Sequence, residues 1–486
     1  MKNKKIPALI LIIILLLGVT PYLIGKMAKE NIEDQVARMS EIPGYSIKII
    51  EYDLGWFTSR MVLSYGLDEH TLSIMAKSTP KSNEPEMFDL IKQGLVFDFT
   101  IAHGPITYQK GINLAIMTAQ GSLQEIKSTK YLKVKKELGI DEIIDLFVKL
   151  SFNGTTDFKA RITDFDYDGQ DRSGTKLTVV FEGMDLTANI NASFDEYNLT
   201  IIAPKLSIVS KAGELSLSQI NSSANGIRLN DYLWLGHGDF SFAQLNLKDT
   251  PKNIAFTVKN YSSKYAISKE DDKFLRFKWN NNIDNFTNHD LNIQDITLDT
   301  DFAHLDILAM TDYIKSIRQS YQNDVSQEEA AKNIQMVAIR AGENVLKGSP
   351  KLIIHHLDFL MNDGFFKSDA TVTFDGDDLI NIQQLSDPLM LNKKLSVLAN
   401  IKFDKIMANA LTAIGVKKQM TTGGVDLSKL PKEQLDQMIN VQTSAALQTF
   451  INQGYLQSED DIYSSHFHMK DGHKLINGKA LAIPGL

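Results

Sequence analysis

The stretch Leu95-Val96-Phe97-Asp98-Phe99-Thr100-Ile101 indicates the fold class of this chain. Apolar and polar side chains alternate along it, and β-branched and aromatic residues prevail, as in a strand that buries one face. The same two-residue period recurs from about residue 45 to residue 300, in runs separated by glycine, asparagine and aspartate. Further runs are Ser46-Ile47-Lys48-Ile49, Leu177-Thr178-Val179-Val180-Phe181 and Leu215-Ser216-Leu217. Many successive strands with short turns predict a large, curved antiparallel β-sheet.

Helical spacing of apolar residues interrupts this β pattern, so we predict an α+β fold that is mainly β. The expected amphipathic helices cover residues 141–150, 303–321, 327–346, 404–414 and 431–452. Strands return at residues 351–360 and 365–374, around a turn at Asn362-Asp363-Gly364. Two short strands, at residues 463–469 and 473–476, are expected to close the chain.

The N-terminus carries a stretch that is apolar enough for a transmembrane helix. Ile6 to Ile24 contain no charged residue, are dominated by leucine and isoleucine, and follow the basic start Met1-Lys2-Asn3-Lys4-Lys5. At about 1.5 Å per residue this stretch nearly spans the hydrocarbon core of a bilayer. Because lysines precede it, we predict a cytoplasmic N-terminus, a single pass through the bacterial inner membrane and a periplasmic bulk. Residues 27–39 are expected to form a short helix that leaves the membrane.

A cleaved signal peptide is the alternative for this stretch. Its apolar part is long for a signal peptide, and Lys26-Met27-Ala28 places lysine where cleavage needs a small residue. We therefore expect a cytoplasmic start and retained anchor at residues 1–26. A periplasmic β-rich region at 27–300 and a periplasmic α+β region at 301–486, continuous with the preceding sheet, complete the predicted organisation.

The composition narrows the classes of function. A chain of 486 residues with 43% hydrophobic residues can fill a large core, which excludes a disordered protein. Its 51 basic and 59 acidic residues are interspersed, so we expect no nucleic-acid partner, since nucleic-acid binders carry basic patches. The absence of cysteine excludes disulfides, thiol nucleophiles and a lipoprotein anchor.

An acidic run suggests calcium at first sight. Asp164-Phe165-Asp166-Tyr167-Asp168-Gly169 has the alternating carboxylates of a calcium loop, but Arg172 and Thr175 occupy positions where such a loop needs ligands. The favoured interpretation is a strand with Phe165 and Tyr167 pointing inward and a turn at Asp168-Gly169.

Four histidines are the other candidates for metal binding. His355 and His356 are adjacent, and His466 and His468 are spaced to lie on one face of a strand. Zinc would need further ligands whose proximity a sequence does not reveal, so surface or turn histidines are favoured. The chain also lacks the compact motifs of hydrolases, nucleotide-binding proteins and zinc proteases. We therefore expect a non-enzymatic protein without a cofactor or a metal.

Several short motifs carry a resemblance to a known family. They are Pro43-Gly44-Tyr45, the segment Tyr52-Asp53-Leu54-Gly55-Trp56-Phe57-Thr58-Ser59, Leu233-Trp234-Leu235-Gly236 and the tail Leu475-Ile476-Asn477-Gly478-Lys479. Together they resemble the YdgA-like family of Gram-negative inner-membrane or periplasmic proteins of unknown function. The resemblance spans nearly the whole chain and supplies no catalytic residues. It makes Gly55, Trp56, Phe57, Trp234, Asn477 and Gly478 candidates for structural or recognition roles.

Two interpretations of the Gly55-Trp56-Phe57 motif stay open. Gly55 permits a bend or a close approach of the backbone, which fits a bulged strand anchored by Trp56. Alternatively, Trp56 and Phe57 form an exposed patch for recognition or for contact with a membrane edge. Asn477-Gly478 is interpreted as a turn near the end of the chain.

Two functional hypotheses follow from the predicted sheet. A curved sheet offers a concave apolar face, by architectural analogy with AsmA-like lipid-handling proteins, and would bind a lipid or another hydrophobic ligand in the periplasm. The alternative is a scaffold or interaction protein, with homodimerisation as one form, that supports envelope integrity or motility. An open apolar face would favour the first, whereas a filled core with an exposed patch on a helix or edge strand would favour the second.

Overall fold

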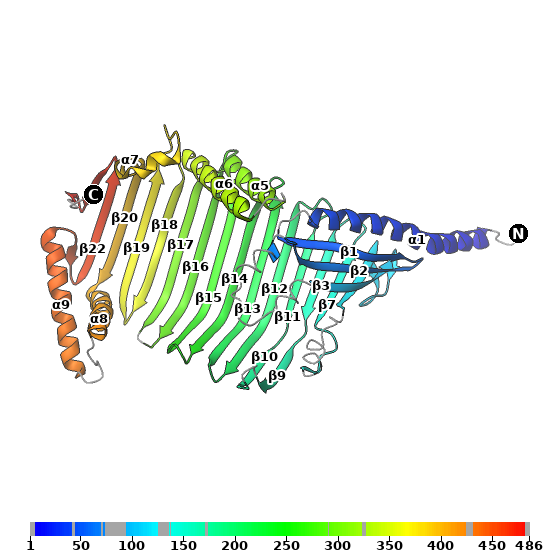
Figure 1. Cartoon of the computed structure of the whole chain (residues 1–486), viewed down its shortest axis with the longest axis horizontal. Coiled ribbons are helices and arrows are strands. Elements are labelled where there is room, and N and C mark those ends of the chain that lie inside the picture. Colours follow the sequence, from blue (N-terminus) through cyan, green and yellow to red (C-terminus); the bar gives the residue numbers. More distant parts are fainter. Residues whose placement is uncertain are drawn as a thin grey trace. The chain divides into compact units, whose positions relative to one another are not determined.

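The computed structural model describes residues 5–40, 44–69, 71–72, 94–124, 136, 138–170, 174–289, 291–322, 327–423 and 431–481. Figure 1 follows the elements along the chain by colour. The chain divides into two compact units. Unit 1 comprises Met1–Lys211, Gln219–Tyr232 and Ile314–Gln335, and unit 2 comprises Ala212–Ser218, Leu233–Tyr313 and Met336–Leu486. Antiparallel strands dominate both units, which confirms the prediction of a mainly β fold.

Unit 1 is built on antiparallel strands that pair largely in chain order. β1, β2, β3, β6, β7, β8, β11 and β12 follow one another across the sheet, and the β9–β10 hairpin pairs with the second half of β12. The elements are α1 (Lys5–Ser40), β1 (Tyr45–Leu54), β2 (Thr58–Leu67), β3 (Leu95–His103), β4 (Ile106–Thr107), β5 (Asn113–Leu114), β6 (Met117–Leu123), β7 (Ile144–Leu150), β8 (Thr156–Ile162), β9 (Phe165–Gln170), β10 (Lys176–Phe181), β11 (Met184–Ile190), β12 (Glu196–Ser210) and residues 219–228 of β13 (Gly213–Arg228).

One face of this sheet carries the core of unit 1. Met61 pairs with Phe99, and Phe99 pairs with Gly121, so these residues point to the same side. Phe99 is buried, and a Cβ on Gly121 would lie 2.3 Å from its ring, so only glycine leaves room for the phenylalanine. Ala28 of α1 is fully buried in the same cluster, with Ile32 beside it. Helix α1 therefore covers the apolar face of this part of the sheet.

Small residues allow α1 to pack closely against the end of strand β3. Pro21, Gly25 and Ala28 are buried at helical spacing, and a Cβ on Gly25 would lie 2.2 Å from Cε1 of His103. The buried His103 ring is 2.9 Å from Ser59 Oγ through Nε2, and its Nδ1 donates to the carbonyl oxygen of Trp56 at 3.3 Å. Burial lowers the pKa of His103, although bonds to backbone carbonyls of Trp56 and Pro21 oppose this effect. A neutral imidazole therefore lies beneath the helix.

Helix α1 is longer than the sequence predicts. The expected anchor at residues 6–24 and the expected short helix at 27–39 merge into one continuous helix, with Pro21 inside it. Among the residues that the structure describes, no helix combines the length and the apolar character that a membrane crossing requires.

Unit 2 continues the antiparallel pattern with longer strands. Strands β14 to β20 pair in chain order, β22 pairs with β20, and β21, β23 and β24 complete the C-terminal part. The elements are β14 (Trp234–Asp249), β15 (Ile254–Lys269), β16 (Phe274–Asn288), β17 (Asn292–Asp306), α5 (Ile307–Gln322), α6 (Gln327–Lys347), β18 (Lys351–Met361), β19 (Gly364–Phe374), the 3-10 helix η1 (Ile382–Ser386), α7 (Pro388–Lys394), β20 (Leu395–Asp404), α8 (Lys405–Thr422), α9 (Lys432–Gln453), β21 (Gln457–Glu459), β22 (Ile462–Lys470), β23 (His473–Ile476) and β24 (Lys479–Ala480). Residues 213–218 of β13 also belong to this unit, whereas 314–335, from α5 and α6, belong to unit 1.

Two of the predicted helices are wrong in part or in whole. Residues 144–150, inside the helix expected at 141–150, form strand β7, because pairing with β6 and β8 on both sides directs Leu146 and Leu150 into the core. Residues 303–306, the start of the helix expected at 303–321, belong to β17. Asp306 then caps α5, since its carboxylate accepts a 2.9 Å hydrogen bond from the Ala309 N–H.

Other elements agree with the prediction. Helix α6 covers the stretch expected at 327–346, and β22 and β23 contain the two closing strands. Asn362 and Asp363 both have positive φ, as the turn between β18 and β19 requires. Helix α8 begins after Asp404, whose carboxylate accepts a 2.8 Å bond from the Met407 N–H.

Candidate functional site

The sheet of unit 2 has one face that is mainly apolar. Residues that pair directly across antiparallel strands point to the same side, so the strand register gives the composition of each face. One row of paired residues crosses from β15 to β22 without a polar member: Ile267, Phe277, Phe302, Leu352, Val372, Val397 and Met469. The neighbouring row is Tyr265, Trp279, Thr300, Ile354, Ala370, Ala399 and Phe467. We call this side of unit 2 the apolar face.

A shared irregularity keeps the long strands apolar on one side. In each of the strands β14 to β17, two successive residues of the apolar face are three positions apart in the sequence instead of two. These wider steps lie opposite one another across the sheet, and the pairing between strands continues unbroken from β14 to β16. The steps run from Phe242 to Leu245, from Val258 to Tyr261, from Ile283 to Phe286 and from Ile293 to Ile296. Asn260 and Asp295, within two of these steps, have left-handed backbone conformations, and the Asn260 amide donates to Asp284 at 2.8 Å. Because the wider step lies at the same place in all four strands, the alternation of apolar and polar residues shifts by one position there. The apolar side chains on both sides of the step therefore stay on the same face of the sheet.

Aromatic rings in the middle of the apolar face are partly open to solvent. Phe240, Tyr265, Trp279 and Phe302 are each 37–39% exposed. The rings contact one another: Tyr265 stacks on Phe277, with ring centroids 6.4 Å apart, and Phe277 lies 6.1 Å from Phe302. The indole N–H of Trp279 donates to Ser263 Oγ at 2.9 Å, which leaves the ring itself as an apolar contact surface.

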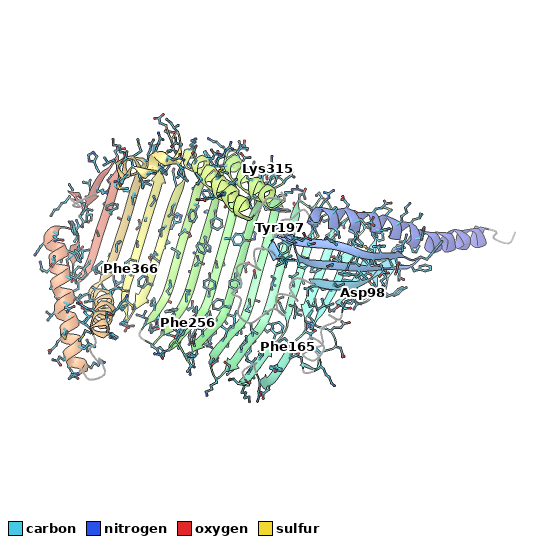
Figure 2. The ribbon with its side chains drawn as sticks, in the orientation of Figure 1. Asp98, Phe165, Tyr197, Phe256, Lys315 and Phe366 are labelled. Carbon is cyan, nitrogen blue, oxygen red and sulfur yellow. The ribbon has the colours of Figure 1, made fainter. Side chains whose placement is uncertain are left out.

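Helix α8 covers one end of the apolar face. Met407 of this helix is fully buried and packs with Ala410 against Met361, next to the stacked rings of Phe359 and Phe366. Figure 2 shows Phe366 on β19 and Phe256 farther along the sheet on β15. The apolar face is therefore capped by a helix at one end and open at its centre.

A pocket of about 400 Å³ lies where α8 meets the ends of β17 and β18. Leu291, Met361 and Ile414 contribute apolar surface to it, and Lys417 and Lys418 from the last turns of α8 add two ammonium groups. This combination of an apolar floor and a basic edge suits a molecule with a hydrocarbon part and an anionic group.

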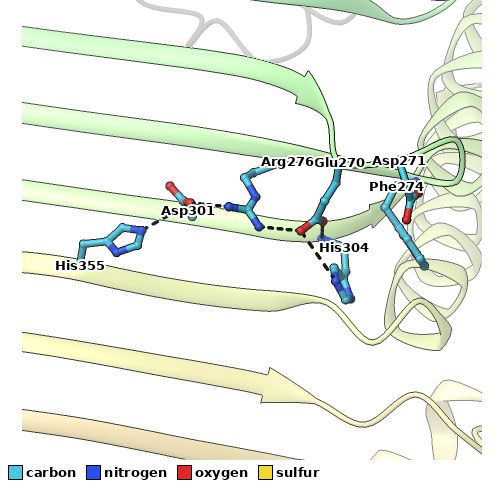
Figure 3. Close-up of polar contacts among 7 residues, drawn as sticks. All are labelled: Glu270, Asp271, Phe274, Arg276, Asp301, His304 and His355. Atoms are coloured by element: carbon cyan, nitrogen blue, oxygen red, sulfur yellow. Dashed lines mark hydrogen bonds and ion pairs between the residues drawn. The ribbon is translucent and has the colours of Figure 1, made fainter.

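The opposite face of unit 2 is polar and carries a charged network near the ends of β15 to β18. Figure 3 shows the Arg276 guanidinium between two carboxylates, 2.6 Å from Glu270 and 3.5 Å from the buried Asp301. His355 Nε2 lies 3.4 Å from the same Asp301 oxygen, Oδ2, and the His304 backbone N–H donates to Glu270 at 2.9 Å. Burial raises the pKa of Glu270, but the bonds from Arg276 and His304 outweigh it and hold the pKa below its usual value.

This network predicts a pH-dependent contribution to the stability of unit 2. A carboxylate with a lowered pKa stabilises the fold above its ordinary pKa, and the contribution disappears as the pH falls through the folded-state value. Glu270→Gln is therefore expected to lower the free energy of unfolding by about 2 kcal/mol near pH 7 and by less at pH 4, which lies below the ordinary glutamate pKa. Urea unfolding at the two pH values measures this difference.

Asp272→Asn is the matched control, because Asp272 is fully exposed in the same β15–β16 turn and pairs with the exposed Lys269 at 3.5 Å. It is expected to leave stability unchanged at both pH values. An equal loss for Glu270→Gln at pH 7 and pH 4 would contradict the assignment of an ionised Glu270.

Three of the four histidine candidates lie together on the polar face. His355, His356 and His466 line a shallow groove of about 490 Å³, and His466 Nδ1 is 2.6 Å from Asn400 Oδ1. Within the described residues, no group of three or more histidine or acidic side chains is arranged to hold a metal ion. His468 pairs with Leu398 on the neighbouring strand.

The acidic run lies on strand β9. Phe165 and Tyr167 are half-buried, and Asp166 and Asp168 are exposed, in the alternation that the sequence predicts. The turn expected at Asp168-Gly169 is wrong, because β9 continues to Gln170 and pairs there with β10. Asp168 lies 3.2 Å from the Lys176 ammonium, which helps to lower the pKa of its carboxyl group.

The Gly55-Trp56-Phe57 motif forms the turn between β1 and β2. A Cβ on Gly55 would lie 2.2 Å from the carbonyl oxygen of Thr58, so this tight turn requires glycine. The register shift of the β1–β2 pair lies between Ile49 and Glu51, away from Trp56. Trp56 and Phe57 are exposed, and the indole stacks on Tyr22 of α1 at 5.1 Å.

The remaining predicted residues are separate from this motif. Trp234 is the first residue of β14, half-buried beside the buried Leu233. Asn477 and Gly478 form the β23–β24 turn with positive φ. The Asn477 side chain joins two elements, since it accepts from the His466 N–H at 2.8 Å and donates to the Gly454 carbonyl, after α9, at 3.0 Å.

The two residues that bound the predicted anchor both fall in α1. Ile24 is half-buried in the part of α1 that meets the sheet. The side chain of Ile6 lies outside the described residues.

Sequence reasoning missed the extent of the apolar face. Its signal is present in the strand pattern, but whether the face is covered depends on where the helices pack. The close packing of α1 against the sheet was also missed, although Pro21, Gly25 and Ala28 provide small residues at helical spacing.

These features define a class of protein: a long N-terminal helix joined to extensive antiparallel sheet, with a partly open apolar face. A family model described as "Bacterial protein of unknown function (DUF945)" matches residues 1–484. The chain therefore belongs to the DUF945 family of bacterial proteins. No curated protein and no solved structure matches it.

Proposed function

We propose that this protein is anchored in the bacterial inner membrane by α1 and binds an acyl-chain lipid on the apolar face of unit 2 in the periplasm. The exposed centre of that face carries the proposal. Large contiguous apolar surfaces are uncommon on soluble proteins, and they serve as contact sites for ligands, proteins or membranes. A hydrocarbon chain suits this surface because its contacts need no polar partner.

The membrane anchor is supported by the sequence of the first helical turns. The stretch from Ile6 to Ile24 is uncharged and follows four lysine and asparagine residues, as in a single-pass helix with a cytoplasmic N-terminus. Its backbone lies within α1. The finer resemblance to the YdgA-like family agrees with this envelope location.

The basic edge of the α8 pocket favours an anionic headgroup. Lys417 and Lys418 lie next to apolar surface from Met361 and Ile414, so a phosphate or carboxylate would contact ammonium groups while its chain follows the apolar side. The double variant Lys417→Glu/Lys418→Glu is expected to weaken binding of phosphatidylglycerol about tenfold and to leave binding of uncharged diacylglycerol unchanged. A titration with a fluorescent analogue of each lipid measures both affinities.

A matched charge reversal on the other face controls for net charge. Lys367→Glu/Lys402→Glu changes a directly paired couple on the polar face by the same four charges. It is expected to leave both affinities unchanged. Equal losses in the two double variants would show that the charge effect is not local to the pocket.

Quantification of co-purified lipid tests the proposal directly. The full chain and the variant Ile401→Asp, which changes a partly exposed residue of the apolar face, are purified in the same detergent, and their lipids are extracted and counted by mass spectrometry. Lipid around the anchor is common to both proteins, so the face-bound lipid is the difference. The proposal expects about one additional lipid in the wild-type protein, and equal lipid content would contradict it.

A scaffold is the second candidate function. Helix α9 buries only Ile439, Thr443 and Leu447, while Val441 and Phe450 are exposed on it, which leaves apolar side chains for a partner or a second copy. A lipid-free dimer that dissociates on Val441→Asp would favour this function over lipid binding.

A further inference from the structure

One end of the sheet of unit 1 gathers several turns at the place where α1 crosses it. A chain of backbone hydrogen bonds marks this end: His103 N–H to the Phe57 oxygen at 2.8 Å, Gly104 N–H to Ile116 at 2.7 Å, and Ile116 N–H to Leu150 at 2.9 Å. The β1–β2 turn, the base of the β4–β5 hairpin and the turn after β7 therefore lie side by side.

Large apolar side chains project from these turns. Trp56, Phe57, Ile106, Leu114 and Phe152 are 44–68% exposed. Ile106 and Leu114 are paired directly at the base of the β4–β5 hairpin, which follows His103 after a turn at Gly104 and Pro105. We call these five residues the apolar rim.

The apolar rim is continuous with α1. Trp56 stacks on Tyr22, which lies within the uncharged stretch of the helix, and Gly25 fixes the helix against His103 at the end of β3. From Thr20 back to Lys5 the helix extends roughly 24 Å farther, at 1.5 Å per residue. Trp56 thus places the rim at the level at which the apolar part of α1 begins, and Lys26 and Lys29 follow about one and two turns later.

We propose that the apolar rim inserts into the interfacial zone of the inner membrane and seats unit 1 on the bilayer around α1. This inference rests on the membrane anchoring proposed above. Tryptophan and other aromatic side chains favour the headgroup level of a bilayer, where their apolar bodies leave water and their polar edges stay hydrated. Lysines just beyond the apolar stretch meet lipid phosphates. The apolar turns lie side by side at one end of the sheet, next to the uncharged stretch of α1, and a bilayer is the occupant that contacts all of them at once.

Quenching of Trp56 by lipid tests this seat in the full-length protein. The wild-type protein and Trp56→Phe are reconstituted into vesicles of phosphatidylethanolamine and phosphatidylglycerol brominated near the carboxyl end of one acyl chain. The other two tryptophans, Trp234 and Trp279, are common to both proteins, so the difference in emission isolates Trp56. Flotation of the vesicles on a density gradient reports anchoring separately.

The expected result is that both proteins float with the vesicles and that the Trp56 contribution is strongly quenched and shielded from iodide in the water. Flotation with an unquenched, iodide-accessible Trp56 would overturn the rim and leave the anchor intact. Failure of both proteins to float would overturn the anchor and the rim with it. The variant Phe57→Ser/Phe152→Ser supplies a second readout, because it should reduce shielding of Trp56 without reducing flotation.

Discussion

Replacement of Trp279 with aspartate is expected to weaken binding of a long-chain fluorescent fatty acid to the full-length protein at least about tenfold, or 1.4 kcal/mol. Trp279 lies on the apolar face between Tyr265 and Thr300, and more than a third of its surface is open. A carboxylate at this position would have to lose its hydration against a hydrocarbon chain. Fluorescence titration in detergent below its micellar concentration measures the change in affinity.

Two further variants separate this effect from general damage. Ile401→Asp changes another partly exposed residue of the same face and should also weaken binding, whereas Val441→Asp changes an exposed residue on α9 and should not. Circular dichroism and hydrogen exchange of β16 check that each variant remains folded. Equal affinity in all folded variants would place the ligand away from the apolar face.

The second large effect concerns the core that joins α1 to the sheet. Phe99→Ala removes a buried ring that fills the space above Gly121 and packs near Met61 and Ala28. Large-to-small changes of buried aromatic residues cost about 3–5 kcal/mol, because the cavity closes only partly. Protection of the β3 and β6 amides from hydrogen exchange is therefore expected to fall by about a hundredfold or more.

Phe57→Ala is the matched control for this prediction. It makes the same chemical change at an exposed phenylalanine of the neighbouring β1–β2 turn, so protection in β3 should change by less than about threefold. Similar losses for the two variants would contradict the core assigned to unit 1.

The sequence predicted the mainly β fold and the late elements well, because their signals are local. Asn362-Asp363 adopts the left-handed turn that its residue types favour, and Asn477-Gly478 does the same. Residues 144–150 were wrong as a helix, because Ile144-Asp145-Leu146-Phe147-Val148-Lys149-Leu150 fits both periods. Pairing with β6 on one side and β8 on the other stabilises the strand conformation of these residues.

The candidate site was less predictable, since it depends on contacts between distant strands. The row that joins Ile267 to Met469 spans seven strands, and no local pattern states which residues become partners. The break at Asn260 also hides the alternation, because the apolar residues on either side of it step by three. Exposure of Trp56 and Phe57 was foreseen as one of two alternatives, whereas the stacking of Trp56 on Tyr22 depends on where α1 lies.

The central claim, that the apolar face of unit 2 binds an acyl chain, is tested most directly by mapping where a photoreactive long-chain fatty acid attaches to the full-length protein. Peptide mass spectrometry after irradiation identifies the labelled segments, and an excess of unlabelled fatty acid reveals which labelling is saturable. The account predicts saturable labelling within β14 to β20, at residues that flank Tyr265, Trp279 and Phe302. Saturable labelling confined to α9, or only non-saturable labelling of α1, would contradict it.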